Sequence, residues 1–272
     1  MVLPAYNEAA DLRSCLDAIM AQTVAPYEVI VVDNNSSDDT ASIAAEYPGV
    51  RVLSEPRQGV VYARTCGFDA ARGDIIGRID ADTLLKSNWI ETVQRIFSDD
   101  AELAAVSGRV RYYDTAWKSA VNGFDHFFRK VLGGNKMFLQ GVNMALRRDS
   151  WQLVREHVCL RGGLHEDFDL AIHLHDLGLR VGYDDRLLAG ISLRRMNADF
   201  SSYLNYVRVQ PRTFMDHGKY RVASVYIVAV LAVFAYVPCR LLYRGFDPER
   251  ERFSLRRMLF LNSLARPDPT DI

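Results

Sequence analysis

Residues 59–83 read GVVYARTCGFDAARGDIIGRIDADT, and this stretch decides the fold. Residues 59–71 have the spacing of a helix, and the apolar run at residues 75–79 predicts a buried strand. The triplet Asp80-Ala81-Asp82 follows that strand directly. Because ligands in open α/β sheets bind outside the carboxyl ends of the strands, we expect these carboxylates to line a ligand crevice.

The same alternation of strand and helix extends back to the first residues. We predict strands at residues 2–3, 27–32 and 50–53, separated by helices at residues 12–20 and 40–46. This order is typical of an α/β fold, a Rossmann-like, mostly parallel sheet flanked by helices. Asp33 follows the second strand, so we expect it to share one cleft with Asp80 and Asp82.

Beyond residue 100 the pattern becomes mixed, and we interpret this part as the acceptor side of the domain. The expected elements are a strand at 104–112, an aromatic amphipathic stretch at 117–132, a strand-like run at 137–146, a helix from 165–167 to Gly178, and a strand at 179–183. One catalytic domain is therefore expected over residues 1–215.

Composition excludes several classes of protein. The 272 residues carry a formal net charge of -1, which argues against a nucleic-acid partner because such proteins have a basic excess. The four cysteines, at positions 15, 66, 159 and 239, form no CxxC pair, so neither a zinc cluster nor a disulfide framework is expected. No basic stretch followed by an apolar run begins the sequence, so we expect the chemistry to face the cytosol.

The Asp-x-Asp spacing indicates a metal site. Asp80 and Asp82 project near one another, and two adjacent negative charges are tolerable where a cation offsets their repulsion. Mg²⁺ or Mn²⁺ prefers carboxylate and phosphate oxygens, so either ion would bridge Asp82 and Asp80 to a diphosphate. The alternative is a solvated surface turn, in which such triplets are common by chance.

Five ordered motifs together resemble the family-2 glycosyltransferases, whose fold is the α/β arrangement called GT-A. They are PAYNEAADL at residues 4–12, VIVVDNNSSDDT at 29–40, GVVYARTCGFDAARGDIIGRIDADT at 59–83, QGVNMALRR at 140–148 and HEDFDLAIHLHDLG at 165–178. The resemblance covers roughly residues 2–185. It implies transfer of a sugar from a nucleotide-diphosphate sugar with inversion at the anomeric carbon.

The resemblance also implies which residues bind the nucleotide sugar. These are Pro4, Ala5, Tyr6, Glu8, Asp33, Asn34, Arg64, Asp80 and Ala81. Arg212 is added as a candidate for its place on a helix and not from the resemblance. Asn34 stands where many members have a second Asp, and its amide both donates and accepts, so the nucleobase stays open. For Arg64, the alternative is an ordinary surface position on a helix.

The dipeptide Glu166-Asp167 resembles the family's acidic pair, in which the Asp is the catalytic base. A positioned carboxylate that takes the proton of an acceptor hydroxyl contributes about a hundred- to ten-thousandfold in rate. The alternative is that both acids only complement the positive end of the following helix. His165 is more simply a hydrogen-bonding neighbour than a metal ligand.

The C-terminal part raises two further questions. Arg208 and Arg212 are four residues apart, so they share a helix face and could clamp a diphosphate or face lipid headgroups. The Gln-x-x-Arg-Trp motif of processive members is absent, because Gln210 is followed by Pro-Arg-Thr-Phe. We therefore expect a single sugar transfer.

Residues 222–239 contain no charge and are just long enough to cross a bilayer. Basic residues flank the run on both sides, and a simple span would export the more basic flank, against the tendency of Lys and Arg to stay inside. We therefore predict that residues 216–272 form a helical, re-entrant or interfacial anchor on the cytoplasmic face of the cell membrane. The alternative is a buried core helix.

Taken together, the sequence predicts a metal-dependent glycosyltransferase of cell-envelope glycan or glycolipid synthesis. Its expected acceptor is a glycan, a glycolipid or a polyprenyl phosphate. One alternative is a nucleotidyltransferase, which needs a glycine-rich phosphate loop after its first strand, whereas residues 4–12 contain no glycine. The other is a non-catalytic sugar-nucleotide-binding scaffold at the membrane, for which a metal or base residue should be missing.

Overall fold

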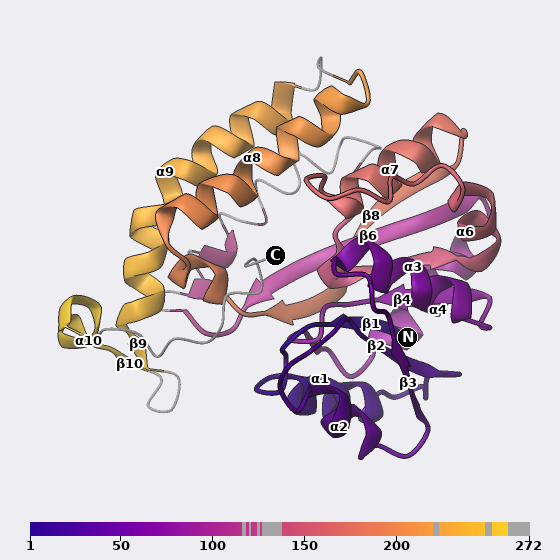
Figure 1. Ribbon diagram of the computed structural model, residues 1–272, viewed down its shortest axis with the longest axis horizontal. Helices are drawn as coiled ribbons and strands as arrows, with labels where there is room; N and C mark the ends of the chain where they lie inside the picture. Colours follow the sequence, from indigo (N-terminus) through magenta and orange to yellow (C-terminus); the bar gives the residue numbers. More distant parts are fainter. Residues whose placement is uncertain are drawn as a thin grey trace. The chain divides into compact units, whose positions relative to one another are not determined.

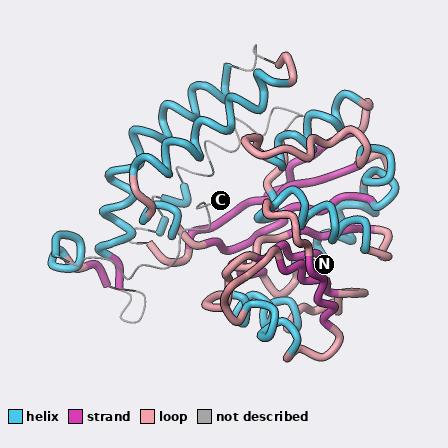
Figure 2. Tube along the Cα trace, in the orientation of Figure 1, coloured by secondary structure: helices cyan, strands magenta, loops and turns pink. Residues whose placement is uncertain are grey.

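The computed structural model describes residues 1–115, 118–119, 121–123, 126, 138–219, 223–247 and 252–260. They fall into two compact units, coloured by sequence in Figure 1 and by secondary structure in Figure 2. The first comprises residues 1–110 and the described part of 135–190, and the second the described parts of 111–134 and 191–272. Each unit has its own hydrophobic cluster.

One eight-stranded sheet, with the order β3-β2-β1-β4-β7-β6-β8-β5, underlies the first unit. Its strands are β1 (Val2–Ala5), β2 (Val29–Asp33), β3 (Val50–Ser54), β4 (Ile75–Arg78), β5 (Leu84–Leu85), β6 (Leu103–Tyr112), β7 (Met144–Arg147) and β8 (Arg180–Ile191). The run β3-β2-β1-β4 is parallel, and β7 joins it antiparallel to β4. The predicted α/β fold, with its parallel sheet at the candidate site, is confirmed.

Two layers of helices cover the two faces of this sheet. They are α1 (Leu12–Met20), α2 (Thr40–Ala45) and α4 (Trp89–Asp99) on one face, and α3 (Val60–Ala70), α6 (Arg148–Val154) and α7 (Glu166–Asp176) on the other. Successive side chains of a strand point to opposite faces of the sheet. Leu3 and Val31 therefore pack with the first set of helices, and Val2 and Val32 pack with the second. This double burial explains why the strands are apolar on both faces.

The second half of the first unit differs in detail from the sequence prediction. The strand-like run at 137–146 is divided into a 3₁₀ turn, η1 (Gly141–Asn143), and β7, while the strand predicted at 179–183 continues to Ile191. The helix predicted to end before Gly178 is α7, and Gly178 has the left-handed φ of 74° that closes it. Most of the amphipathic stretch at 117–132 lies outside the described residues.

The C-terminal unit is built on two long helices, α8 (Phe200–Asp216) and α9 (Ala223–Gly245), which lie side by side in Figure 1. A short 3₁₀ turn, η2 (Arg194–Asn197), precedes them, and β9 (Phe246–Asp247), β10 (Arg252–Phe253) and α10 (Leu255–Phe260) follow. Tyr203 of α8 packs with Ala229 and Tyr236 of α9. The compact unit therefore includes α8, whereas the predicted division at residue 215 falls inside that helix.

Helix α3 approaches the sheet more closely than a side chain would allow. A Cβ atom added at Gly67 would lie 2.4 Å from Val2 Cγ1 and 3.0 Å from Val32 Cγ2. Both valines are fully buried in β1 and β2, so neither can move aside without disturbing the sheet. The missing side chain at position 67 lets α3 lie directly on the strands that lead to the candidate site.

We expect Gly67→Ala to destabilise the protein by about 1–3 kcal/mol, because overpacking a dense core forces the backbone to shift. Gly162→Ala is the matched control, since a Cβ there meets no atom within 4 Å. Urea denaturation measures both. Adding Val2→Ala removes the nearest clashing atom and should restore part of the lost free energy of unfolding. If Gly67→Ala leaves the free energy of unfolding unchanged, the close approach is contradicted.

Candidate active site

The loops that follow β1 and β2 are fastened to each other by side chains. Asn7 adopts the left-handed φ of 52°, which Asn tolerates better than most residues. Its Oδ1 accepts a hydrogen bond from the N–H of Ser37 at 2.8 Å, and its own N–H donates to Oγ of Ser36 at 3.0 Å. The N–H of Glu8 donates to Oγ1 of Thr40 at 2.8 Å. The first two sequence motifs therefore form one structural unit.

The side chain of Asn34, which is predicted to contact the nucleotide, forms hydrogen bonds with the protein's own backbone. Its Nδ2 donates to the carbonyls of Glu55 at 2.8 Å and Arg57 at 2.7 Å, and its Oδ1 accepts from the N–H of Gly59 at 2.7 Å. The side chain is buried, so it holds the connection from β3 to α3 in place. Asp33 beside it is half-buried.

The strand register brings Asp33 and the Asp-x-Asp triplet to the same edge of the sheet. Ala5 pairs with Asp33, while Val2 pairs with Arg78. The N–H of Ile79 still donates to the carbonyl of Val2 at 3.4 Å, so the triplet begins where β4 leaves β1. Neighbouring strands lie about 4.8 Å apart, so β2 and β4, on either side of β1, lie about 10 Å apart. Asp33 and the start of the triplet therefore lie at the same edge of the sheet, and the predicted shared cleft stays a prediction.

The buried thiol of Cys15 feels the negative charge of three carboxylates. Burial raises the pKa of Cys15, and the negative charges of Asp82, Asp80 and Glu8 raise it further. The Sγ atom of Cys15 also lies 3.7 Å from the carbonyl oxygen of Asp80. Such a cluster of carboxylates, with Asp80 and Asp82 both partly exposed, has the oxygen donors that Mg²⁺ or Mn²⁺ prefers.

Arg78 connects the Asp-x-Asp triplet to the acidic dipeptide. Its Nη2 lies 3.0 Å from Oδ1 of Asp80 and 2.9 Å from Oε1 of Glu166, and its Nη1 lies 3.4 Å from Oδ1 of Asp167. Burial acts to lower the pKa of this guanidinium, but the surrounding carboxylates raise it above its ordinary value. Sequence reasoning missed Arg78, although a charge inside the apolar run IIGRI was a visible signal.

The backbone at Gly141 contacts the Asp167 carboxylate directly. Its N–H donates to Oδ2 of Asp167 at 2.6 Å. A Cβ atom at position 141 would lie 0.9 Å from Nη1 of Arg78 and 2.6 Å from Oδ1 of Asp167. The backbone can therefore reach the Asp167 carboxylate because residue 141 has no side chain.

Arg64 is fully buried and pairs with Glu166. Its Nη1 lies 2.5 Å from Oε2 of Glu166 and donates to the Glu166 carbonyl at 2.7 Å. The alternative of an ordinary surface position is therefore wrong. The predicted contact with the nucleotide stays a prediction, and in this structure the guanidinium serves the acidic dipeptide.

The two acids of the dipeptide differ sharply in acidity. Burial alone would raise the pKa of Glu166, but the charges of Arg78 and Arg64 outweigh it and lower the pKa to about 2. For Asp167, burial and the adjacent Glu166 charge raise the pKa well above its ordinary value. The two neighbouring carboxyls are therefore shifted in opposite directions, and the predicted role of Asp167 as the base stays a prediction. His165 Nδ1 lies 3.9 Å from Oδ2 of Asp167, and its ring stacks on Phe168.

The other predicted nucleotide-sugar residues lie on two units. Pro4 and Ala5 are buried at the end of β1, Tyr6 is half-buried after it, and Ala81 is buried between the two acids. Arg212 is exposed on α8 in the C-terminal unit, on the same helix as the exposed Arg208. Its predicted contact with a diphosphate stays a prediction.

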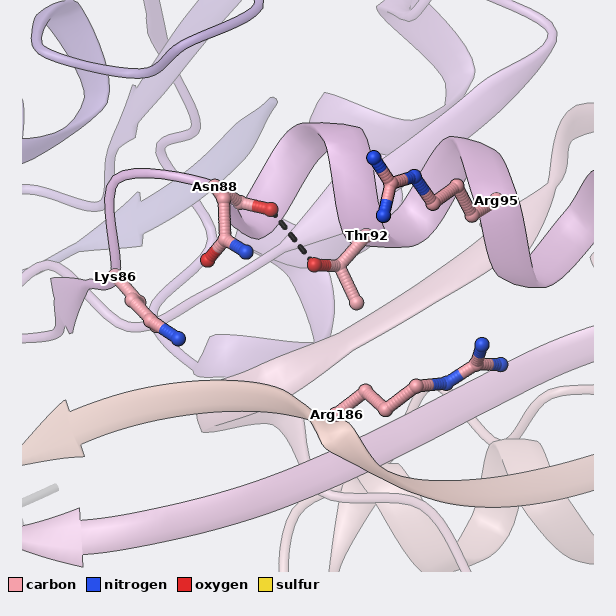
Figure 3. A pocket seen from close by; sticks show the side chains of 5 residues that line it. All are labelled: Lys86, Asn88, Thr92, Arg95 and Arg186. Carbon is pink, nitrogen blue, oxygen red and sulfur yellow. Dashed lines mark hydrogen bonds between the residues drawn. The ribbon is translucent and has the colours of Figure 1, made fainter.

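A surface hollow of about 290 Å³ lies elsewhere on the first unit. Figure 3 shows the side chains that line it. It is lined by Lys86, Asn88, Thr92, Arg95 and Arg186. Both arginines of the hollow form ion pairs, Arg95 with Glu91 at 2.5 Å and Arg186 with Asp184 at 2.7 Å. The hollow contains none of the predicted site residues.

Comparison with known proteins supplies independent findings. Residues 1–154 match the sequence profile described as Glycosyl transferase family 2. Glycosyltransferase AglE of Haloferax volcanii is 31% identical over 160 residues, which cover 55% of this chain and 52% of that protein. The chain spans about half the length of the curated relatives it matches, or less.

Two solved structures share the fold. Mannosyltransferase PcManGT from Pyrobaculum calidifontis, in complex with GDP-Man and Mn²⁺, has a TM-score of 0.67 at 19% identity, over 87% of this chain and 73% of that one. Glucosyl-3-phosphoglycerate synthase from Mycobacterium tuberculosis, in complex with Mn²⁺, UDP-Glc and phosphoglyceric acid, has a TM-score of 0.57 at 23% identity, over 80% and 78%. These likenesses show a GT-A fold.

The buried Arg64–Glu166 pair gives a testable prediction about stability. We expect Arg64→Met to cost about 3–5 kcal/mol in urea denaturation, because it leaves part of a buried charge uncompensated. The double variant Arg64→Met/Glu166→Gln should lose less than the sum of the single variants. Arg13→Met is the control, since the exposed Arg13–Glu46 pair is worth at most about 1 kcal/mol.

The pH dependence should follow the lowered pKa of Glu166. Its folded pKa of about 2 lies below the unfolded value, so its stabilisation is complete above about pH 4.5 and is lost as pH falls toward 2. Glu166→Gln should remove this part of the pH dependence. Additive single variants, or an unchanged pH profile, would show that the pair does not stabilise the folded state.

Proposed function

Because this chain belongs to glycosyl transferase family 2, we propose that it transfers a sugar from a nucleotide-diphosphate sugar to an acceptor oxygen. The observation that carries the proposal is Arg78, whose guanidinium contacts both Asp80 of the Asp-x-Asp triplet and Asp167 of the acidic dipeptide. Asp80 and the candidate base Asp167 are thus held within one ion-pair network.

Donor binding is assigned to the edge where β1, β2 and β4 end. Glu8, Asp33 and the backbone at Pro4, Ala5 and Tyr6 would hold the nucleoside, and Asp80 and Asp82 would hold Mg²⁺ or Mn²⁺. The bound ion would neutralise the charge of the nucleoside diphosphate. Mn²⁺ accompanies GDP-Man in one neighbouring structure and UDP-Glc in the other, which supports the metal and leaves the nucleobase open.

Asp167 is assigned as the general base. As the acceptor oxygen bonds to the anomeric carbon, the bond from that carbon to the diphosphate breaks, and the acceptor proton moves to an Asp167 oxygen. Direct displacement inverts the anomeric centre. Gly141 orients the carboxylate through its N–H, while Glu166 stays ionised between Arg64 and Arg78 and thereby raises the proton affinity of its neighbour.

The alternatives fit the structure less well. A nucleotidyltransferase lacks support because the loop after β1 contains no glycine, and side chains of the β2 loop fasten it instead. A non-catalytic scaffold at the membrane has no need of a base with a raised pKa at the end of a network that begins at Asp80. The acceptor is proposed to be a glycan, a glycolipid or a polyprenyl phosphate.

The donor assignment is tested by thermal unfolding with UDP-glucose, GDP-mannose and a dTDP-sugar, each with and without Mn²⁺. We expect one donor to raise Tm only with Mn²⁺, because a ligand bound to the folded state stabilises it. Asp82→Ala should lose this shift. Asp74→Asn, an almost fully exposed acid, is the control. A shift that persists in Asp82→Ala would refute the metal site.

The base assignment is tested by release of nucleoside diphosphate, with water as the acceptor. We expect Asp167→Asn to lower release about a hundred- to ten-thousandfold while keeping the donor-dependent Tm shift. In the wild type the rate should fall as pH drops through a midpoint above about 3.9, the ordinary Asp pKa, because protonated Asp167 cannot accept a proton. Normal transfer by Asp167→Asn to a polyprenyl phosphate would identify an acceptor that is already ionised.

We propose further that α9 attaches the protein to the cytoplasmic face of a membrane. Residues 225–245 are long and apolar enough to cross a bilayer, by length and composition. One side of α9 packs on α8, whereas Ile227, Val230, Phe234 and Val237 form an exposed apolar stripe at helical spacing. Because α8 carries charged residues, the packed pair fits an interfacial position better than a simple span.

Co-sedimentation with vesicles of phosphatidylcholine and phosphatidylglycerol tests this attachment. We expect Phe234→Glu/Val237→Glu to reduce binding at least tenfold, because each change places a charge against the acyl region. Leu153→Glu, at an exposed leucine of α6, is the matched control. Release of the bound protein by alkaline carbonate would agree with an interfacial helix. Resistance to it would indicate a spanning one.

A further inference from the structure

A second cluster of metal-binding side chain types lies on α7, outside the proposed reaction centre. Asp169 and His173 are one helical turn apart, so they share a face of the helix. His173 Nε2 lies 3.4 Å from Oδ1 of Asp169 and 3.9 Å from Sγ of Cys159, which precedes the helix. The three donor atoms all lie within 4.8 Å of one another.

The geometry of the cluster distinguishes a metal site from a nucleophilic triad. In a Cys–His–Asp triad the carboxylate and the thiol bind opposite nitrogens of the imidazole, which lets the ring relay a proton. Here Asp169 and Cys159 both face Nε2. The carboxylate oxygen, the sulfur and the nitrogen therefore face one common point, where a shared ion could bind all three.

The distances suit zinc in particular. Tetrahedral Zn²⁺ binds sulfur at about 2.3 Å and nitrogen or oxygen at about 2.0–2.2 Å, which sets its ligand atoms about 3.3–3.6 Å apart. The observed N–O separation of 3.4 Å falls in that range, and the S–N separation of 3.9 Å exceeds it slightly. Thiolate and imidazole ligands favour Zn²⁺ over Mg²⁺ or Mn²⁺.

Contacts around the ligands fix them before any ion binds. The second oxygen of Asp169, Oδ2, accepts a hydrogen bond from the N–H of Cys159 at 2.9 Å. Asp169 is fully buried in the helix layer, and His173 is mostly buried. Hydrogen bonds of this kind orient the ligands of metal sites.

We propose that Cys159, Asp169 and His173 bind a zinc ion separate from the metal at Asp80 and Asp82. Binding replaces the thiol proton of Cys159, which leaves to solvent, with the bond to zinc. The ion joins the segment before α7 to the first two turns of the helix, close to Asp167.

The sequence offered no sign of this site. Its ligands have the spacing C-x9-D-x3-H, which matches no common zinc motif, and the cysteine pattern predicted no zinc cluster. Folding of the segment at 155–165 back along α7 brings Cys159 to the helix.

Cobalt substitution tests the proposal without any donor or acceptor. The purified, reduced chain is titrated with Co²⁺, and we expect one equivalent to give the near-ultraviolet thiolate-to-cobalt charge-transfer band. Cys159→Ser should abolish this band, and His173→Gln should weaken it by at least tenfold in Co²⁺ affinity. Cys66→Ser and His175→Gln, a second thiol and an exposed histidine of α7, should leave it unchanged.

Two further measurements separate this site from the proposed catalytic metal. Asp82→Ala should keep the band, because Asp82 is not a ligand of this site. Cys15, the thiol near Asp82, is not a ligand of it either. One equivalent of Zn²⁺ should raise Tm of the wild type by about 5 °C, and of Cys159→Ser not at all. A band that survives in Cys159→Ser, or the absence of any band, would show that the cluster is held by hydrogen bonds alone.

Discussion

A buried guanidinium among three carboxylates is the interaction on which the rest of the site depends. Arg78 is almost fully buried in the central part of the sheet, and it is tolerable there only because Asp80, Glu166 and Asp167 surround it. Each of those acids is likewise buried or partly buried. Removing Arg78 would leave the buried carboxyls of Glu166 and Asp167 without a positive partner that both contact. The network therefore fixes the distance between the Asp-x-Asp triplet and Asp167, the proposed base.

Sequence patterns predicted the parts of this arrangement that repeat along the chain. Apolar runs followed by acids identified Asp33, Asp80 and Asp82 at one edge of the sheet, because parallel strands end together. The helix that begins at Glu166 was also predicted. These features are local, so the identity and spacing of neighbouring residues suffice to find them.

Contacts between distant segments were not predictable in the same way. The Arg64–Glu166 pair joins residues 102 positions apart, and the close approach of Gly141 to Arg78 depends on how β4 and β7 lie together. Asn34 was expected to face a ligand, yet its amide bonds to three backbone groups of the β3–α3 connection. A polar residue in a motif can serve the ligand or the loop, and composition does not distinguish the two.

The hydrogen bonds between the β1 and β2 loops have a consequence for how fast the protein recognises its donor. Asn7 and Glu8 are already fastened to Ser36, Ser37 and Thr40 before any nucleotide arrives. The conformational entropy of these loops is therefore lost during folding, and little ordering remains for the moment of encounter. We expect association of the proposed donor at these loops to resemble docking onto a rigid surface, with an association rate set by diffusion and orientation and not by loop closure.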